Sequence, residues 1–337
     1  MTVMPAETAT ATEAILEARG LTKHFTVGGN FWSGRKILHA VDDLDVVLRP
    51  GHITALVGES GSGKSTVARL LARIYPATTG DIIFNGRSIV RDRGRRRNLS
   101  YRSDVQMIFQ DPFSSLNPVR RIRHHLARPL LIHNVVPRRE VSARIHSLLT
   151  RVGLVPPRYF ESVFPHQLSG GQRQRVAIAR ALAVDPKVLL ADEPISMLDV
   201  SIRIGILNLM LGLKEQQGLA FLYITHDIAS ARYVADDILV MYAGHVVEKG
   251  RVDDVLGEPQ HPYTQLLLSA VPNPQEGLAT RRMATRGEVP AIVNPKPGCR
   301  FAPRCPFVMD ICRQVTPKLA DQGGGRSVRC HLYPGST

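Results

Sequence analysis

The first 298 residues of the sequence contain no cysteine, and all four cysteines of the 337-residue chain follow them. Any chemistry that those 298 residues perform therefore proceeds without a thiol. Long apolar runs are also missing, since none approaches the ~18–20 residues that a membrane-spanning helix needs. The composition, 44% hydrophobic and 21% charged, is typical of a soluble globular chain with one large domain and an appendage, or with two domains.

The N-terminal residues lack the basic start and the apolar core of a secretory signal. They are instead rich in Ala and Thr. We expect a disordered lead-in over residues 1–13, and a cytoplasmic protein.

Basic residues outnumber acidic ones, 43 to 29, which gives a formal net charge of +14. Much of the excess lies at residues 91–102 and 120–128. Such charge suits nucleic acid, an anionic membrane surface or a nucleotide polyphosphate, and it is equally typical of a solvated basic face. Charge alone therefore leaves the partner open.

The pattern of apolar residues predicts strands and helices in alternation. Residues 14–57 alternate apolar and polar positions and end in the short apolar run "ITALV". Helical spacing follows at 64–75, and two more apolar strands, 187–192 and 219–225, enclose a helix at 201–218. This order predicts an α/β fold with a mixed or parallel sheet at its core.

The remaining segments differ in character from this core. Residues 111–185 are largely helix-like and form a predicted helical subdomain. From about residue 257 the composition shifts to Pro, Gly and Arg. We therefore expect a main domain over 14–270 and a small cysteine-containing C-terminal appendage over 271–337.

The sequence "GESGSGKS" at 58–65 matches the phosphate-binding loop G-x-x-x-x-G-K-[ST], between a predicted strand and a predicted helix. Glycines allow backbone N–H groups to turn toward phosphate oxygens, and the helix N-terminus adds partial positive charge. Lys64 is expected to reach the β- and γ-phosphates, and Ser65 to coordinate Mg²⁺. The residues expected to surround the phosphates are Gly58, Glu59, Ser60, Gly61, Ser62, Gly63, Lys64, Ser65 and Thr66.

The segment "VLLADEP" at 188–194 ends an apolar strand on two carboxylates. Asp192 is placed to hold Mg²⁺, and Glu193 to polarise an attacking water. Pairs of acidic residues are common on surfaces, so the Asp-Glu pair alone is weak evidence. Together with the phosphate loop it indicates a nucleotide site.

"LSGGQ" at 168–172, followed by "RQRVAIARAL", resembles the signature motif of ABC-type ATPases, and the resemblance extends over about residues 14–270. It implies that Phe25 stacks on adenine, that Gln110 contacts Mg²⁺, that Asp199 lies at a dimer contact, and that His226 contacts the γ-phosphate. It also implies that a second subunit's nucleotide is contacted by the signature residues Ser169, Gly170, Gly171 and Gln172. The sequence is thus identified as an ATPase whose paired subunits close on ATP and separate after Glu193-assisted hydrolysis.

Three further segments resemble the ATPase subunits of oligopeptide and dipeptide importers: "DPFSSLNPVRRI", "HPYTQLLLSAVP" and "GCRFAPRCPFVMDIC". An insertion, "TVGGNFWSGRKILHAV", resembles the second of the two ATPase subunits that such importers use. The implied partners are a paralogous ATPase subunit rather than a second copy, two membrane permeases, and, indirectly, an external substrate-binding protein. The implied location is the cytoplasmic face of the membrane, without nucleic acid. A non-transport ABC ATPase acting on nucleic acid or ribosomes is the alternative.

The spacing of Cys299, Cys305, Cys312 and Cys330 is C-x₅-C-x₆-C-x₁₇-C. Structural zinc usually shows a C-x₂₋₄-C pair, which is absent, and cytoplasmic disulfides are uncommon. Wide spacing suits a cluster of several iron atoms, and the importer resemblance implies a 4Fe–4S cluster here. Zinc and a metal-free group of reduced thiols remain alternatives. We expect the arginines beside the cysteines to offset thiolate charge: Arg300, Arg304, Arg313 and Arg329.

Overall fold

The computed structural model of the chain describes residues 13–28, 35–90, 94–111, 115–269 and 292–336. The predicted lead-in, apart from residue 13, and the domain boundary at 270/271 lie outside these residues. The same holds for part of the basic stretch at 91–102 and part of the insertion at 26–41.

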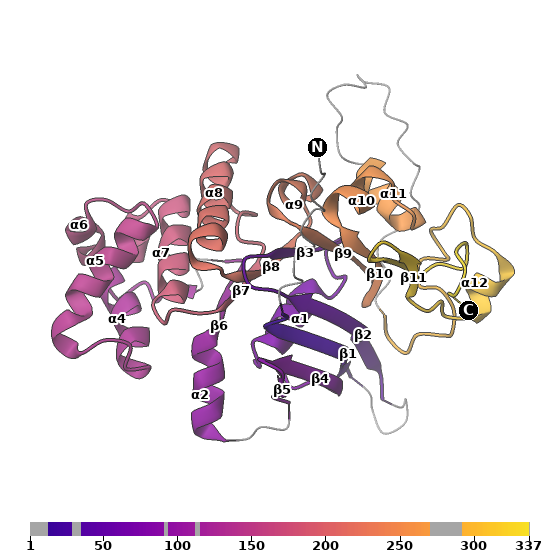
Figure 1. The fold of residues 1–337 in the computed structure, drawn as a ribbon, viewed down its shortest axis with the longest axis horizontal. Helices are drawn as coiled ribbons and strands as arrows, with labels where there is room; N and C mark the ends of the chain where they lie inside the picture. Colours follow the sequence, from indigo (N-terminus) through magenta and orange to yellow (C-terminus); the bar gives the residue numbers. More distant parts are fainter. Residues whose placement is uncertain (1–12, 29–34, 91–93, 112–114, 270–291, 337) are drawn as a thin grey trace, which may run out of the picture.

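An eight-stranded mixed sheet forms the centre of the molecule (Figure 1). Five of its strands, including the predicted "ITALV", are parallel, and the three at one edge are antiparallel. In spatial order the strands are β11 (Ala320–Gly323), β12 (Arg326–Val328), β10 (His245–Arg251), β9 (Asp237–Tyr242), β3 (Ile53–Val57), β8 (Ala220–Thr225), β7 (Val188–Asp192) and β6 (Val105–Ile108).

A second, antiparallel sheet packs against one face of the central sheet. Its strands, in spatial order, are β2 (Ile37–Leu48), β1 (Leu16–Thr26), β4 (Thr79–Phe84) and β5 (Arg87–Ser88). Helix α1 (Lys64–Leu71) contributes Leu70 and Leu71 to the same buried cluster, which also contains Leu56 of β3. Successive side chains of a strand point to opposite faces of the sheet. Leu56 therefore belongs to this cluster, whereas Ile53, Ala55 and Val57 belong to the cluster on the opposite face.

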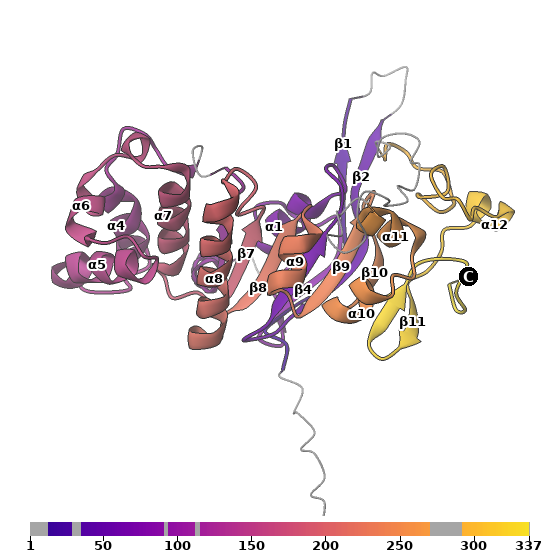
Figure 2. The same cartoon turned by 90° about the horizontal axis from the view of Figure 1, so that it is seen from above.

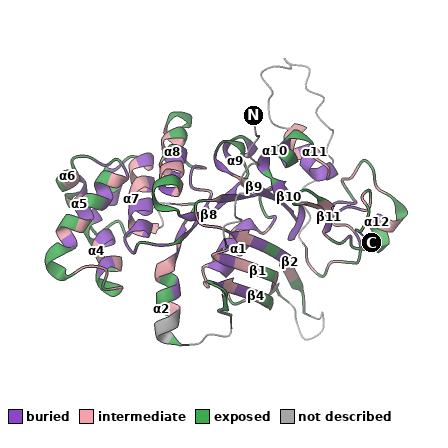
Figure 3. Ribbon diagram, in the orientation of Figure 1, coloured by how far each residue is buried: buried purple, intermediate pink, exposed green. Residues whose placement is uncertain are grey.

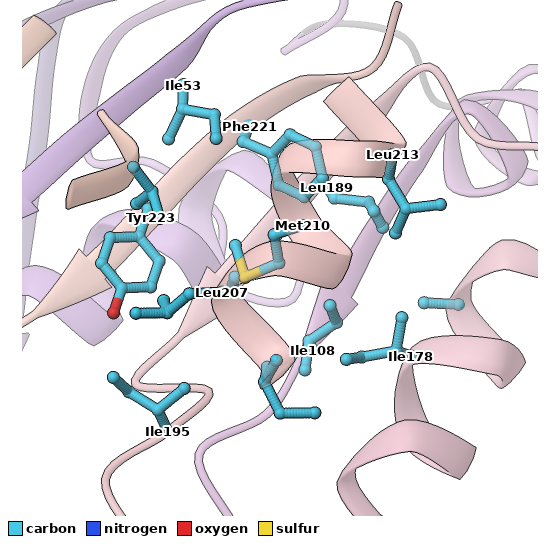
Figure 4. Packing of buried hydrophobic residues seen from close by; sticks show 14 of the residues in the cluster. Ile53, Ile108, Ile178, Leu189, Ile195, Leu207, Met210, Leu213, Phe221 and Tyr223 are labelled. Carbon is cyan, nitrogen blue, oxygen red and sulfur yellow. The ribbon is translucent and has the colours of Figure 1, made fainter. Parts of the chain in front are cut away.

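Helices α8 (Val200–Gln217) and α9 (Ile228–Val234) cover that opposite face (Figure 2). Figure 4 shows two side chains of α8 against the sheet, Leu207 beside Tyr223 and Met210 toward Leu189 and Phe221. Gly218 ends α8 in the left-handed region, with φ 62°, as expected for a glycine after the last helical turn.

A group of helices lies at one end of the molecule, as predicted for residues 111–185 (Figure 1). Figure 3 shows buried residues on their inner sides and exposed residues on their outer sides. The elements are α4 (Ile122–Ile132), η1 (Arg138–Glu140), α5 (Val141–Arg151), α6 (Pro157–Ser162), η2 (Pro165–Gln167) and α7 (Gly170–Leu182), with α2 (Arg95–Asp104) before them beside β6.

The C-terminal elements lie at the other end of the molecule (Figure 1). They are α10 (Val252–Gly257), α11 (Pro262–Ser269), α12 (Asp310–Gln314) and the hairpin of β11 and β12. This hairpin pairs with β10, so residues 320–328 complete the central sheet. Within the part of the chain that the structure describes, no helix has the length and apolar character needed to cross a bilayer.

Candidate functional site

The phosphate loop connects β3 to α1, as the sequence predicts. Lys64 opens α1 with only 4% of its surface exposed, and its Nζ donates to the carbonyl oxygens of Gly58 at 2.7 Å and Glu59 at 2.8 Å. Burial lowers the pKa of Lys64, and the carboxylates of Glu193, Asp192 and Glu59 oppose that shift. Carbonyl oxygens of the loop therefore hold the Lys64 ammonium group beside the predicted position of the phosphates.

Two glycines of the loop are required by close backbone contacts. Gly63 has φ 106°, and a Cβ there would lie 2.2 Å from the carbonyl oxygen of Ala40. A Cβ on Gly58 would lie 2.1 Å from the carbonyl oxygen of Met241. Neither position accepts a side chain unless the neighbouring strand moves.

The residues predicted to hold Mg²⁺ meet beside Lys64. Ser65 Oγ donates to Asp192 Oδ1 at 2.9 Å, and Gln110 Nε2 donates to Glu193 Oε2 at 3.0 Å. Asp192 is 2% exposed, and burial raises its pKa while the bond from Ser65 lowers it. Hydroxyl, amide and carboxylate oxygens are the hard ligands that Mg²⁺ prefers, so these residues fit that ion.

Glu193 and His226, the two residues predicted to be catalytic, lie in contact. His226 Nδ1 lies 3.2 Å from Glu193 Oε1. Glu193 adopts φ 45°, in the left-handed region that residues with a Cβ rarely occupy, and its N–H donates to Ile224 O at 2.9 Å. Such backbone strain is maintained only where surrounding structure holds it, and it is common at functional sites.

An open cavity of about 460 Å³ is lined by Lys64, Ser65 and Glu193, whereas Asp192 and His226 are not among the described residues that line it. Phe25 lines it and meets Tyr75 edge-on, with 5.4 Å between ring centroids. The other predicted residues at the cavity are Ser60, Gly61, Gly63, Lys64, Ser65, Thr66, Gln110 and Glu193. Residues that sequence reasoning missed complete the lining: Leu38, His39, Ala40, Ala243, Gly244 and Ile292.

The signature residues lie elsewhere, at the start of α7. Ser169 and Gln172 form a capping box, in which Gln172 N donates to Ser169 Oγ at 3.3 Å and Ser169 N donates to Gln172 Oε1 at 3.0 Å. A Cβ on Gly171 would lie 2.5 Å from Ile202 Cγ2, so Gly171 allows α7 to approach α8, which Asp199 precedes. Among the described residues that line the cavity, none belongs to 169–172 or to 199.

The C-terminal arginines pair with carboxylates of the nucleotide-binding core. Arg300 Nη2 donates to Asp42 Oδ2, Arg304 donates to Glu59 of the phosphate loop, and Arg329 Nη2 donates to Asp43 Oδ2 at 3.2 Å. The expectation that these three arginines offset thiolate charge is therefore wrong. No local sequence pattern signals pairs that are separated by more than 240 residues.

The four cysteines face one small cavity, together with Phe301 and Leu332. Burial raises the pKa of Cys299 to about 11, and it also raises the pKa of Cys305 and Cys330. Among the described residues, no three of the thiols have sulfur atoms within 4.8 Å of one another. Tetrahedral zinc needs sulfurs about 3.8 Å apart, so the spacing disfavours zinc.

One other group of metal-ligand type was found among the described residues: His24, His39 and Asp42. Asp42 accepts bonds from both imidazoles and from Arg300, and these bonds hold its pKa well below the usual range against the effect of burial. Because a guanidinium already neutralises the carboxylate, this group is an ion-pair network rather than a cation site.

Comparison with known families gives two matches. The family described as "ABC transporter" matches residues 41–196, and the one described as "Oligopeptide/dipeptide transporter, C-terminal region" matches residues 247–312. The first range contains the phosphate loop, the signature and Glu193. The second contains most of β10, all of α10 and α11, and the first three cysteines.

Several curated proteins resemble the chain over nearly its whole length. The "Oligopeptide transport ATP-binding protein AppF" of Bacillus subtilis (strain 168) is 41% identical over 330 residues, 97% of this chain and 99% of the relative. The "Dipeptide transport ATP-binding protein DppF" of Escherichia coli (strain K12) is 40% identical over 95% of both chains. The "Di/tripeptide transport ATP-binding protein DppF" of Pseudomonas aeruginosa (strain UCBPP-PA14) is 42% identical over 95% of this chain and 98% of the relative.

Two solved structures of transporter ATP-binding subunits resemble the chain in fold. The chain resembles cbiO1 of Clostridium perfringens, described as part of the ABC transporter complex cbiONQ, with a TM-score of 0.62 and 29% identity over 73% of this chain and 91% of that one. It also resembles the ATP-binding cassette MJ0796 in a dimeric post-hydrolysis state with ADP and Pi, with a TM-score of 0.62 and 28% identity over 70% of this chain and 98% of that one.

Proposed function

Since the chain belongs to the ABC transporter family, as an ATP-binding subunit of the oligopeptide/dipeptide importer type, we propose that it hydrolyses ATP to drive the import of oligopeptides or dipeptides. The proposed cargo rests on the names of the relatives and on the matched C-terminal region. The alternative of a nucleic-acid or ribosome ATPase gains no support from these relatives.

The observation that carries the enzymatic part is the placement of Glu193 at the cavity that Lys64 and Ser65 line. In the proposed reaction, Lys64 and the backbone N–H groups of the loop bind the phosphates, and Glu193 orients water toward the γ-phosphate. His226, in contact with Glu193, senses the γ-phosphate. Mg²⁺ held by Ser65, Gln110 and Asp192 supplies neutralisation of phosphate charge.

We propose that Ser169, Gly170, Gly171 and Gln172 contact ATP across a dimer, with Asp199 at the interface. The separation of the start of α7 from the cavity of the same chain supports this arrangement. This chain and a second ATPase subunit would then enclose two nucleotides, and the difference in affinity between ATP and ADP would open and close the pair.

The proposed partners follow from the importer assignment. They are two membrane permeases, a paralogous ATPase subunit and, indirectly, an external substrate-binding protein, with this chain at the cytoplasmic face of the membrane. The insertion at 26–41 supports the paralogue, because it resembles the second ATPase subunit of such importers. Recovery of the intact complex from membranes identifies the second ATPase directly, and recovery of two copies of this chain would contradict the paralogue.

We also propose that Cys299, Cys305, Cys312 and Cys330 hold a 4Fe–4S cluster. The four thiols around one cavity, two buried and two partly buried, fit such a group, and the wide sulfur spacing suits it better than zinc. When bound, the cluster would join residues 299–312 to Cys330, which follows the C-terminal hairpin. Iron and sulfide analysis of anaerobically purified protein tests this, and full occupancy by zinc or the absence of any metal would contradict it.

The decisive experiment measures peptide uptake and ATP hydrolysis by the reconstituted transporter. Glu193→Gln is expected to abolish both while retaining ATP binding, because the amide preserves shape but does not activate water. Unchanged hydrolysis would overturn the assignment of Glu193, and hydrolysis stimulated by nucleic acid rather than by peptide-loaded binding protein would overturn the transport function.

A further inference from the structure

A side chain from the cysteine-rich segment holds the phosphate loop. Arg304 Nη1 donates to Glu59 Oε2 at 2.8 Å, and Arg304 Nη2 donates to Glu59 Oε1 at 3.0 Å. The Arg304 side chain is 8% exposed and that of Glu59 is 28% exposed. A two-point contact in this setting fixes the direction of the carboxylate as well as its charge.

The backbone of Glu59 is held from the same side of the molecule. Its N–H donates to Tyr263 Oη at 2.9 Å. Tyr263 packs against Tyr242 and Phe301, with ring centroids 4.6 and 5.5 Å apart, and the Arg304 guanidinium carbon lies 5.7 Å from the Tyr242 centroid. Arg304 is therefore supported by a buried aromatic group and does not reach Glu59 as a free surface side chain.

The charge of Glu59 matters because of where the residue lies. Its carbonyl accepts from Lys64 Nζ, the group expected to bind phosphate, and its carboxylate acts electrostatically on Lys64. Within a loop built for a polyphosphate, an unpaired carboxylate would repel the ligand. Ser60 and Gly61 line the cavity, whereas Glu59 does not, so the carboxylate is held away from the ligand while its backbone stays in the loop.

We propose that Arg304 is a positioning residue for ATP, which neutralises Glu59 and holds it away from the phosphate site, and thereby sets the affinity of the loop for nucleotide. This inference rests on the proposed ATPase function and extends it, because it makes the C-terminal segment part of the nucleotide site.

The test measures KM for ATP and kcat in the reconstituted transporter. Arg304→Gln is expected to raise KM about 5- to 20-fold, as an uncompensated charge near phosphate would, with kcat at saturating ATP within about twofold of wild type. Arg304→Lys keeps the charge but loses the two-point contact, so its KM is expected to lie between those of wild type and Arg304→Gln.

The double variant Glu59→Gln with Arg304→Gln separates charge from structure. It removes the unpaired carboxylate, so KM is expected to return to within about twofold of wild type. A merely structural role for Arg304 predicts no recovery. Failure of the double variant to recover, or a Lys variant as impaired as the Gln variant, would overturn the proposal.

Arg329→Gln is the matched control, because Arg329 ties the same segment to the core through Asp43 and the carbonyl of Val246 without touching the phosphate loop. It is expected to lower thermal stability and leave KM unchanged. Wild-type protein that hydrolyses no ATP would refute the proposed function. Active wild type with an unchanged KM in Arg304→Gln would refute this inference alone.

Discussion

His226 Nδ1 and Glu193 Oε1 lie 3.2 Å apart, so the two residues proposed to act in catalysis contact each other. Gln110 Nε2 contacts the other carboxylate oxygen of Glu193 at 3.0 Å. Both carboxylate oxygens of Glu193, the residue proposed to activate water, are thus in contact with a neighbouring side chain.

Replacement of the histidine is expected to reduce turnover more than binding. His226→Ala removes a group that contacts Glu193 and is proposed to contact the γ-phosphate, so kcat is expected to fall about 10²-fold or more with little change in the Kd for ATP. Steady-state ATPase assays and equilibrium binding of nucleotide measure the two effects. A large loss of ATP affinity with normal kcat would place His226 outside the catalytic pair.

The magnesium requirement is expected to depend on Ser65. Ser65→Ala removes the hydroxyl that contacts Asp192, so half-maximal activity should need about 10- to 100-fold more Mg²⁺. Ser62→Ala is the control, because Ser62 Oγ is buried on the same loop and has no hydrogen-bond partner among the described residues. A magnesium titration of both variants checks this, and equal shifts in the two would contradict the role of Ser65.

Two glycines in one loop are expected to respond differently to alanine. Gly63→Ala places a Cβ 2.2 Å from Ala40 O, whereas a Cβ on Gly61 meets nothing within 4 Å. Both changes incur the backbone cost of positive φ, about 1–2 kcal/mol, but only Gly63→Ala also displaces a strand. Thermal unfolding and ATP binding should both be clearly worse for Gly63→Ala. Equal effects would show that the contact is relieved without cost.

Acid is expected to destabilise the protein through His261, which is 1% exposed. Burial lowers its pKa from 6.5 to about 3. Between these pH values the imidazole is protonated in the unfolded state and neutral in the folded state. Stability from this group is therefore lost as pH falls below 6.5, by about 2–3 kcal/mol at pH 4.5.

The variant His261→Asn tests this mechanism, because Asn keeps an acceptor for the N–H of Tyr263, which donates to His261 Nδ1 at 3.0 Å. Urea unfolding between pH 7 and 4.5 should show a shallower dependence in the variant than in wild type. The remaining slope comes in part from His245, whose pKa burial also lowers. An unchanged slope would exclude His261 as a source.

The central strands and the nucleotide site could be predicted because each has a strong local signal. The residues of β3, β7 and β8 are all buried, which requires continuous apolar runs, and the phosphate loop requires its glycines for steric reasons. Helix α1 ends at Leu71 rather than at 75, because Arg73 adopts φ 53°, in the left-handed region, where the chain leaves the helix although the apolar spacing continues.

The contacts of the C-terminal segment could not be predicted, because their partners are distant in sequence. The strands "ADQG" and "RSV" are short and polar, so they lack the alternation that identifies a strand. The pairing of Arg304 with Glu59 depends on how two segments 245 residues apart pack together, and no local pattern in a single sequence predicts that packing. The left-handed backbone of Glu193 is likewise imposed by its surroundings, since a glutamate has no preference for it.

The pairing of β12 with β10 has a practical consequence for work on the isolated ATPase core. Glu248 and Lys249 of β10 pair with Val328 and Ser327 of β12. A chain shortened at 270 would therefore leave β10 paired with β9 on one side and unpaired on the other. An unpaired strand edge is a template for other chains, and such a fragment is therefore expected to self-associate. The hairpin protects that edge, and loss of the C-terminal segment would first be seen as aggregation rather than as a smaller active enzyme.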